Sequence, residues 1–140
     1  MNFIKRRVIS SLGFPIKYGL NPHQGAKICK NSDSNIKLIN GIPSYINYLD
    51  AIQSWNLISS IKSYEDNKII STSFKHTTPT GLCLNDSVSE AFINCRNIDP
   101  LSSYGDFIAI SDTIDKNTAK LIKNVVSDGI IALDYTDEAL

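Results

Sequence analysis

The sequence feature that most constrains the fold is the alternation of short β-prone runs with longer segments of helical periodicity. The β-prone runs are Ile36 to Ile39, Lys68 to Phe74, Asp106 to Ile110 and Gly129 to Leu133. Between the later runs, apolar residues recur at the spacing that is typical of amphipathic helices. Strands that alternate with helices are joined by crossover connections, so the sequence predicts an α/β fold with a mainly parallel sheet.

Three helices are expected between these runs. The first extends from Ser44 to about Tyr64, and the second begins at Ser87, which forms an S-x-x-E capping-box pattern with Glu90. The third ends at Gly129, because glycine often terminates helices. Their apolar positions are Ile46, Leu49, Ile52, Trp55, Ile58 and Ile61 in the first, Val88, Ala91, Phe92 and Cys95 in the second, and Ala119, Ile122, Val125 and Val126 in the third.

The composition narrows the classes of partner. With 140 residues, of which 42% are hydrophobic, the chain can form one globular domain with a core. Its formal net charge is zero, which does not favour nucleic-acid binding, and no apolar run approaches the length of a membrane span. The three cysteines include no C-x-x-C pair, which argues against a zinc site and a disulfide framework. We therefore expect a reducing compartment, the cytoplasm.

The first residues differ in composition from the rest of the chain. Residues 1–15 are basic and contain serine but no acidic residue, so we expect a disordered N-terminus, followed by one domain over residues 16–140. Mitochondrial transit peptides have a similar composition, which makes a mitochondrial location the alternative.

Lys75 and His76 are the clearest candidates for catalysis. They follow a β-prone run and precede the turn formers Pro79 and Gly81, and the only other histidine is His23. Ligands of open α/β sheets bind beyond the carboxyl ends of the strands, so this is where chemistry is expected. The lysine could stabilise an oxyanion while a neutral imidazole accepts a proton from an amine nucleophile. The simpler interpretation is a solvated strand end.

Six ordered motifs extend this pair into a family pattern over roughly Ile16 to Leu140. They are Lys17 to Gln24, Asn40 to Ala51, Phe74 to His76, Ser102 to Phe107, Val126 to Ala132 and Tyr135 to Leu140. Their order and spacing resemble the transformylase domain of the bifunctional purine-biosynthesis enzyme, in which aminoimidazole carboxamide ribonucleotide (AICAR) formyltransferase is fused to inosine monophosphate (IMP) cyclohydrolase. The chain resembles the N-terminal half of that domain.

The resemblance implies a fold, a reaction and a set of site residues. The fold would be the first subdomain of a cytidine deaminase-like three-layer structure. The reaction would pass a formyl group from 10-formyltetrahydrofolate to the exocyclic amine of AICAR, giving formyl-AICAR and tetrahydrofolate during IMP biosynthesis. By similarity, His76 would accept the amine proton, with help from the substrate carboxamide, and Lys75 would stabilise charge on the formyl oxygen.

The resemblance also assigns residues to nucleotide binding. Lys17 and Tyr18 fall where the family has an Arg-Tyr pair in contact with the nucleotide, although lysine lacks the bidentate fork of arginine. Asn47, Gly105 and Asp128 match positions that line the AICAR pocket. The simpler interpretation is that Gly105 forms only a turn and that Asp128 belongs to a helix end.

The same resemblance raises the question of a zinc site and indicates which substrates and protein partners to expect. A deaminase zinc site needs H-x-E and P-C-x-x-C, whereas Thr77 and Thr78 follow His76, so no zinc is expected. Because the family's second half carries most of the folate site, and its active sites lie at a dimer interface, the expected partners are AICAR, folate and either a second copy or a complementing second half. Two other functions stay open: a catalytically inactive remnant that binds nucleotide or dimerises, and a generic α/β binding module.

Overall fold

The structure is a computed structural model that describes residues 13–29 and 35–140. The chain divides into two compact units, Met1–Tyr48 and Leu49–Leu140. Most of the N-terminus that we expected to be disordered, residues 1–12, lies outside the described residues, whereas Gly13–Pro15 form strand β1.

The described part of the first unit contains a small antiparallel ladder. Strand β1 pairs with β2 (Lys27–Cys29), and the amide of Gln24 donates to the carbonyl of Asn21 at 3.0 Å in the turn between them. The β-prone run Ile36 to Ile39 is not part of a strand in the structure. β propensity yields a strand only where another strand supplies a ladder, and none of the described strands pairs with this run, whose Leu38 and Ile39 are exposed.

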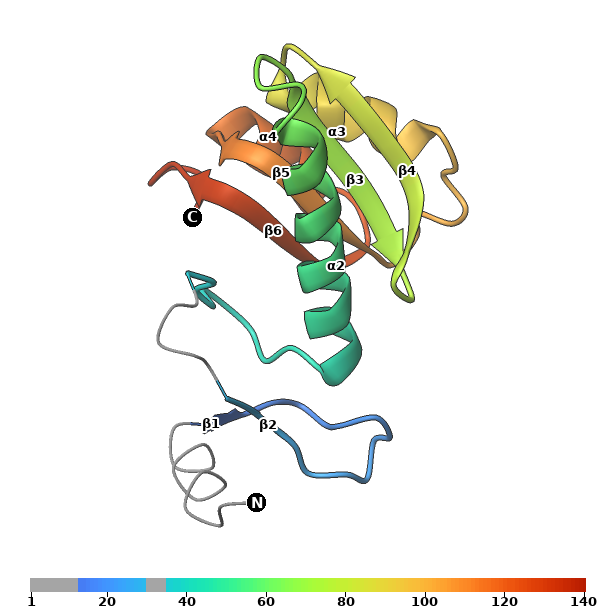
Figure 1. Cartoon of the computed structure of the whole chain (residues 1–140), viewed down its shortest axis with the longest axis vertical. Helices are drawn as coiled ribbons and strands as arrows, with labels where there is room; N and C mark the ends of the chain where they lie inside the picture. The colour runs from blue at the N-terminus through green and yellow to red at the C-terminus, as the bar shows by residue number, and fades with distance from the viewer. Residues whose placement is uncertain (1–12, 30–34) are drawn as a thin grey trace. The chain divides into compact units, whose positions relative to one another are not determined.

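The second unit is built on a described four-stranded sheet with the order β4-β3-β5-β6 (Figure 1). Strand β3 (Ile69–Lys75) pairs antiparallel with β4 (Thr78–Asn85) and with β5 (Asp106–Ile114), and β5 pairs parallel with β6 (Ser127–Tyr135). The α/β class is confirmed. The expectation of a mainly parallel sheet is wrong, because two of the three ladders between the described strands are antiparallel.

The error arises from β4, a segment in which the turn formers Pro79 and Gly81 predict a turn and not a strand. Helix α3 (Val88–Asn97) connects β4, not β3, to β5. Strands β4 and β5 both run antiparallel to β3, so this crossover joins two parallel strands with β3 between them. Pro79 lies inside β4, which is an edge of the described sheet, where a residue without an N–H is tolerated.

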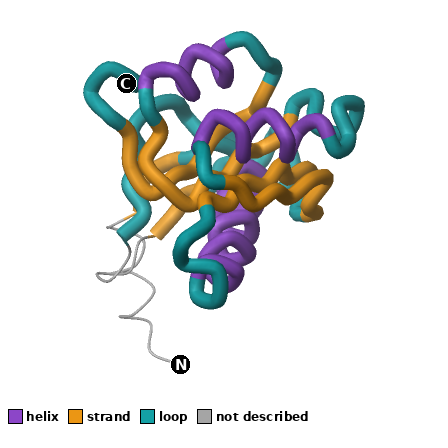
Figure 2. The backbone as a smooth tube through the Cα atoms, turned by 90° about the horizontal axis from the view of Figure 1, so that it is seen from above, coloured by secondary structure: helices purple, strands orange, loops and turns teal. Residues whose placement is uncertain are grey.

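The helices of the described chain cover both faces of this sheet. Figure 2 shows α2 (Tyr45–Lys62) on one side of the strands and α3 with α4 (Lys116–Lys123) on the other. Alternate residues of β5 serve the two layers: Phe107 and Ala109 lie in the clusters that include Ala51 and Ile58 of α2, and Ile108 and Ile110 pack with Phe92 of α3. The sheet is therefore the middle of three layers.

Helix α2 forms almost where it was predicted, but it buries a different face. Its buried residues are Asp50, Ala51, Ser54 and Ile58, whereas Ile52 is 41% exposed. An α-helix turns about 100° per residue, so a strict three-residue spacing moves about 60° around the helix at every step. The predicted apolar stripe consequently winds around α2. Trp55, one of the predicted apolar positions, is partly buried against the cluster of Ile58.

The third predicted helix is shorter than expected. Helix α4 ends at Lys123, and Gly129 belongs to β6 and does not terminate a helix. A Cβ at Gly129 would lie 2.5 Å from Cε2 of Phe107, so the small residue permits close packing between neighbouring strands. The strand predicted at Gly129 to Leu133 is confirmed as the centre of β6.

Candidate active site

The candidate site of the second unit is centred on the turn between β3 and β4. Lys75 pairs with Thr78, and the two residues between them, His76 and Thr77, have φ values of 52° and 65°. Two-residue hairpins favour this left-handed backbone and usually place Asn and Gly there. For residues with a Cβ it costs roughly 1 to 2 kcal/mol each, and β-branched Thr77 is a genuine outlier. Other contacts must therefore stabilise the turn.

Asp50 supplies one such contact from α2. Its Oδ1 accepts a hydrogen bond from the backbone N–H of Thr77 at 2.6 Å, and the residue is only 5% exposed. Burial raises the pKa of Asp50 above its ordinary value. The Thr77 N–H and the positive charge of His76 oppose that shift, and the Asp128 carboxylate adds to it. His76 and Asp128 thus lie close enough to Asp50 for their charges to act on its carboxylate.

Lys75 is held at the same end of the sheet. Its Nζ donates to the backbone carbonyl of Tyr104 at 2.5 Å, which connects the end of β3 to the segment before β5. Gly105 follows with a φ of +70°, a conformation that glycine adopts without the penalty of a side chain. The amide of Gly105 donates to the carbonyl of Val126 at 3.0 Å, so the residues that precede β5 and β6 are also joined.

Asp128 occupies a β-bulge. Asp106 pairs with Ser127 and Phe107 pairs with Gly129, so Asp128 is an extra residue with no partner in the β5–β6 register. Thr80 has the same position in β4, because Ser73 pairs with Gly81 and Phe74 pairs with Pro79. Bulges change the direction of side chains and are common next to active sites. Both bulges lie at the end of the sheet that carries Lys75 and His76.

A buried polar network supports this end of the sheet. The Ser73 hydroxyl donates to Oδ2 of Asp106 at 2.6 Å and lies 2.8 Å from the Thr80 hydroxyl. Asp106 is fully buried and forms an ion pair with Arg96 of α3, whose side chain is 14% exposed. A buried carboxylate needs such partners, since isolated charges are strongly disfavoured in a protein interior. The network fixes the strand positions from which Lys75 and Asp128 project.

These contacts correct the predicted location of the site within the sheet. We expected it beyond the carboxyl ends of parallel strands. Lys75 and His76 do lie at the carboxyl end of β3, but Gly105 and Asp128 lie at the amino ends of β5 and β6. This is the geometric consequence of an antiparallel β3–β5 pair. The structure thus brings together Lys75, His76, Gly105 and Asp128.

The other three predicted substrate-binding residues, Lys17, Tyr18 and Asn47, belong to the first unit. The Lys17 amide donates to the carbonyl of Pro43 at 3.0 Å, and the Tyr45 amide donates to the carbonyl of Tyr18 at 3.3 Å. These bonds join the Lys17–Tyr18 backbone to Pro43 and Tyr45 within the same unit. The Lys17 ammonium lies 5.9 Å from the centre of the Tyr18 ring, within the range of a cation–π contact.

Asn47 has a second role at the start of α2. Its Oδ1 accepts from the amide of Ser44 at 2.9 Å and from the Ser44 hydroxyl at 2.8 Å. The Asn47 amide is 3.4 Å from the Ser44 hydroxyl, so the two residues cap the helix reciprocally. The capping pattern of α2 was not recognised in the sequence because asparagine takes the place of the usual glutamate or glutamine.

We also searched residues 13–29 and 35–140 for a metal site, a reactive thiol and a membrane-spanning helix. These residues contain no group of three or more His, Cys, Asp or Glu side chains that could hold a metal ion. Burial raises the pKa of the Cys95 thiol to about 12, so it does not act as a thiolate nucleophile near neutral pH. No helix within the same residues is long and apolar enough to cross a membrane.

Comparison with known proteins identifies the family. The sequence profile of the AICARFT/IMPCHase bienzyme matches residues 5–140. The chain belongs to this family. It is 34% identical over 131 residues to the "Bifunctional purine biosynthesis protein PurH" of Aquifex aeolicus (strain VF5), a match that covers 89% of this chain and 25% of the relative. It is 33% identical over 133 residues to the protein of the same name from Petrotoga mobilis (strain DSM 10674 / SJ95), covering 91% and 25%. The chain therefore spans about a quarter of the length of these relatives.

Asp50 is the residue at this site that sequence reasoning missed. It is the single acidic residue of α2, and it is buried on the face of the helix that also carries Ala51 and Ser54. A lone carboxylate among apolar and small residues is a signal for a buried partner. Its partner could not be identified from the sequence, because Thr77 is 27 residues away and offers only a backbone N–H.

Proposed function

We propose that this chain forms part of an AICAR formyltransferase site and acts in purine biosynthesis. The observation that supports the proposal most strongly is the convergence of Lys75, His76, Gly105 and Asp128 at one end of the sheet. The resemblance implies that Lys75 and His76 form the catalytic pair and that Gly105 and Asp128 line the AICAR pocket. Membership of the bienzyme family supports the same reaction, and the names of the two relatives support a role in purine biosynthesis.

In the proposed reaction, the exocyclic amine of AICAR attacks the formyl carbon of 10-formyltetrahydrofolate. A new bond joins the amine nitrogen to the formyl carbon, and the bond from that carbon to N10 of the folate breaks. His76 accepts the proton that the amine loses, and N10 takes up a proton as tetrahydrofolate leaves. Because the amine lone pair is delocalised toward the carboxamide, a positioned base contributes strongly to the rate.

Lys75 is suited to stabilise the charge that develops on the formyl oxygen. One N–H of its ammonium donates to the Tyr104 carbonyl, and an ammonium has three N–H donors. A preorganised donor at a developing oxyanion contributes substantially to catalysis. The exposed Asp128 carboxylate, displaced by its bulge, would accept hydrogen bonds from the substrate, and the backbone at Gly105 would leave room for it.

The first unit would contribute to nucleotide binding in the same proposal. Lys17 offers a point charge for a phosphate, and Tyr18 offers a ring face and a hydroxyl. Since Oδ1 of Asn47 is engaged in capping α2, its NH₂ group would donate to the nucleotide. We propose a cytidine deaminase-like three-layer fold for the whole domain, with the folate held largely by the second half of a transformylase domain and with a homodimeric assembly.

The proposal is tested by mixing the chain with AICAR and 10-formyltetrahydrofolate, alone and with a separately expressed second half of the domain. Tetrahydrofolate formation is expected in the complemented mixture, and its absence from both mixtures would overturn the proposal.

Two lysines near opposite ends of β3 provide a matched comparison. Lys75→Met is expected to reduce turnover about 10²- to 10³-fold, the usual effect of losing one oxyanion donor.

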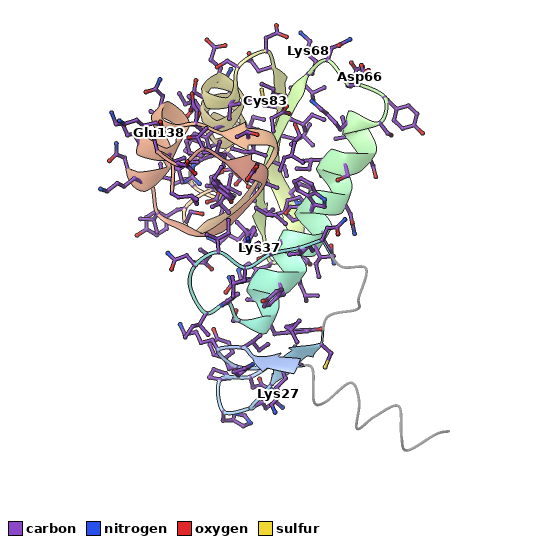
Figure 3. The ribbon with its side chains drawn as sticks, turned by 90° about the vertical axis from the view of Figure 1, so that its left-hand side faces the viewer. Lys27, Lys37, Asp66, Lys68, Cys83 and Glu138 are labelled. Atoms are coloured by element: carbon purple, nitrogen blue, oxygen red, sulfur yellow. The ribbon has the colours of Figure 1, made fainter. Side chains whose placement is uncertain are left out.

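Lys68→Met is the control for that variant. Lys68 is the last residue of the loop between α2 and β3, near Asp66 (Figure 3), and its ion pair with Asp86 is largely exposed. Exposed pairs contribute little, so this variant should retain wild-type turnover. Equal effects of the two substitutions would show that Lys75 has no special role.

A further inference from the structure

Asp50 is a residue to which the resemblance assigns no role, but the contacts of its carboxylate indicate one. Asp50 is buried in α2, accepts the Thr77 N–H at 2.6 Å and lies next to the turn that carries His76. We propose that Asp50 is a positioning residue that holds the His76–Thr77 turn in its left-handed conformation and thereby sets the direction of the His76 imidazole. The catalytic part of this inference rests on the formyltransferase function proposed above.

The backbone of the turn explains why such a residue is needed. Both central residues have positive φ, and neither is glycine or asparagine. A His-Thr pair does not favour this conformation by itself, and a threonine with positive φ is rare. The N–H of Thr77 must also find an acceptor if it is to be removed from water. Asp50 meets both needs, because a charge-assisted hydrogen bond is stronger than a neutral one.

The position of Asp50 is itself fixed by the core. The next residue, Ala51, packs in one cluster with Phe74 and Phe107, and Phe74 directly precedes Lys75 on β3. Helix α2 is therefore anchored against the strand at the point from which the turn begins. A carboxylate on such a support can restrain a backbone amide closely. Small errors in the direction of a catalytic base reduce rates steeply, so this restraint would act on turnover more than on substrate affinity.

The electrostatic surroundings agree with the same role. The charged groups near the turn are Asp50 on α2, Asp128 on β6, and Lys75 and His76 on β3 and its turn. The electrostatic interaction between Asp50 and His76 places the carboxylate near the imidazole as well as near the Thr77 amide, which agrees with a positioning role.

The activity of the complemented mixture gives the first test. Asp50→Ala is expected to lower kcat about 10- to 100-fold with little change in the KM for AICAR, because orientation is lost while the nucleotide contacts remain. Asp50→Asn keeps an oxygen acceptor but loses the charge, so its kcat should lie between that of Asp50→Ala and that of the wild type. In the double variant Asp50→Ala with Thr77→Gly, glycine adopts positive φ freely, so much of kcat should return. Wild-type kcat in Asp50→Ala, or no recovery in the other two variants, would overturn the positioning role.

Amide hydrogen exchange in the 140-residue chain gives a test that does not depend on activity. Asp50→Ala should make the Thr77 amide exchange about tenfold faster or more, which is the factor that a hydrogen bond to a charged group supplies. Asp50→Ser, whose side chain is one bond shorter, should have the same effect if the alanine variant does not fold. The Thr118 amide, which donates to Asp115 at 2.7 Å, is the matched control and should not change.

The two measurements separate the inference from the function on which it rests. Unchanged exchange of Thr77 in both Asp50 variants would overturn the positioning role, whatever the activity of the chain. If the wild-type mixture forms no tetrahydrofolate, the proposed function fails, and faster exchange of Thr77 would still establish that Asp50 holds the turn.

Discussion

The β3–β4 turn and the start of α4 each contain a hydrogen bond from a threonine amide to an aspartate carboxylate, but one carboxylate is buried and the other is exposed. At the turn, buried Asp50 accepts from the amide of Thr77, and at the helix start, exposed Asp115 accepts from the amide of Thr118. Asp115 and Thr118 are three residues apart, whereas 27 residues separate Asp50 from Thr77. The first pair is an ordinary helix cap, and the second joins two elements of the fold.

The pKa values of the two carboxylates shift in opposite directions because their surroundings differ. The Thr118 amide and hydroxyl lower the pKa of Asp115 below its ordinary value, because they stabilise the charged form. Burial raises the pKa of Asp50 in spite of an equivalent hydrogen bond. Ionisation of Asp115 therefore stabilises the folded protein, whereas ionisation of Asp50 lowers the stability of the folded protein. Such a loss of stability is common where a residue serves a functional site rather than the fold.

The largest expected effect on stability concerns Asp106, a buried carboxylate that is also held by distant partners. Asp106→Asn should lower the free energy of unfolding by about 3 to 5 kcal/mol, because it leaves Arg96 charged and largely buried without its partner. Urea unfolding at neutral pH measures this difference.

The Lys68–Asp86 pair is the control for that measurement. Its side chains are 43% and 79% exposed, so Asp86→Asn should change the free energy of unfolding by about 1 kcal/mol or less. Similar losses in the two variants would contradict the view that burial decides how much a carboxylate contributes.

A smaller effect is expected at the local cap. Asp115→Ala should reduce the free energy of unfolding by about 1 kcal/mol, since the first turn of α4 loses its acceptor. Asp115→Asn should cost less, because asparagine is also a good N-cap residue. If the two variants were equally destabilised in urea, the charge rather than the acceptor would be the source of the stability.

The smallest effect, and the one that compares the two aspartates most directly, is the pH dependence of stability. The contribution of Asp115 is present above its ordinary pKa of 3.8 and is lost as the pH falls through its lower folded value. The contribution of Asp50 falls as the pH rises from 3.8 through its raised folded value.

The difference in unfolding free energy between wild type and Asp115→Asn should therefore increase with pH below that value. The difference between wild type and Asp50→Asn should decrease with pH above it. Denaturant titrations at several acid pH values measure both slopes. Slopes of the same sign would show that the hydrogen bond outweighs burial at Asp50.

Elements with strong local signals could be predicted from the sequence. Strand β3 and the buried stripe of Ala91, Phe92 and Cys95 in α3 follow the expected pattern, because β propensity and helical periodicity are properties of neighbouring residues. Even there, the predicted capping box is incomplete. Ser87 is the N-cap of α3, but within the described residues its side chain makes no capping hydrogen bond.

Features that depend on distant residues could not be predicted in this way. Pro79 suggested a loop, but the pairing partner on β3 makes its segment a strand. Gly129 suggested a helix end, but the Phe107 ring explains the need for glycine. Because strand β4 was missed, the sheet was expected to be mainly parallel, and the site was therefore expected at the carboxyl ends of all its strands. At the site, Lys75 and His76 were identified because they are adjacent, whereas Asp50 was missed because its partner is remote.

The most direct measurement of the central claim is the rate of tetrahydrofolate formation by His76→Ala in the complemented mixture, relative to wild type. If His76 is the proton acceptor of a formyl transfer at this end of the sheet, the rate should fall by about 100-fold or more. A wild-type rate in His76→Ala would contradict the account.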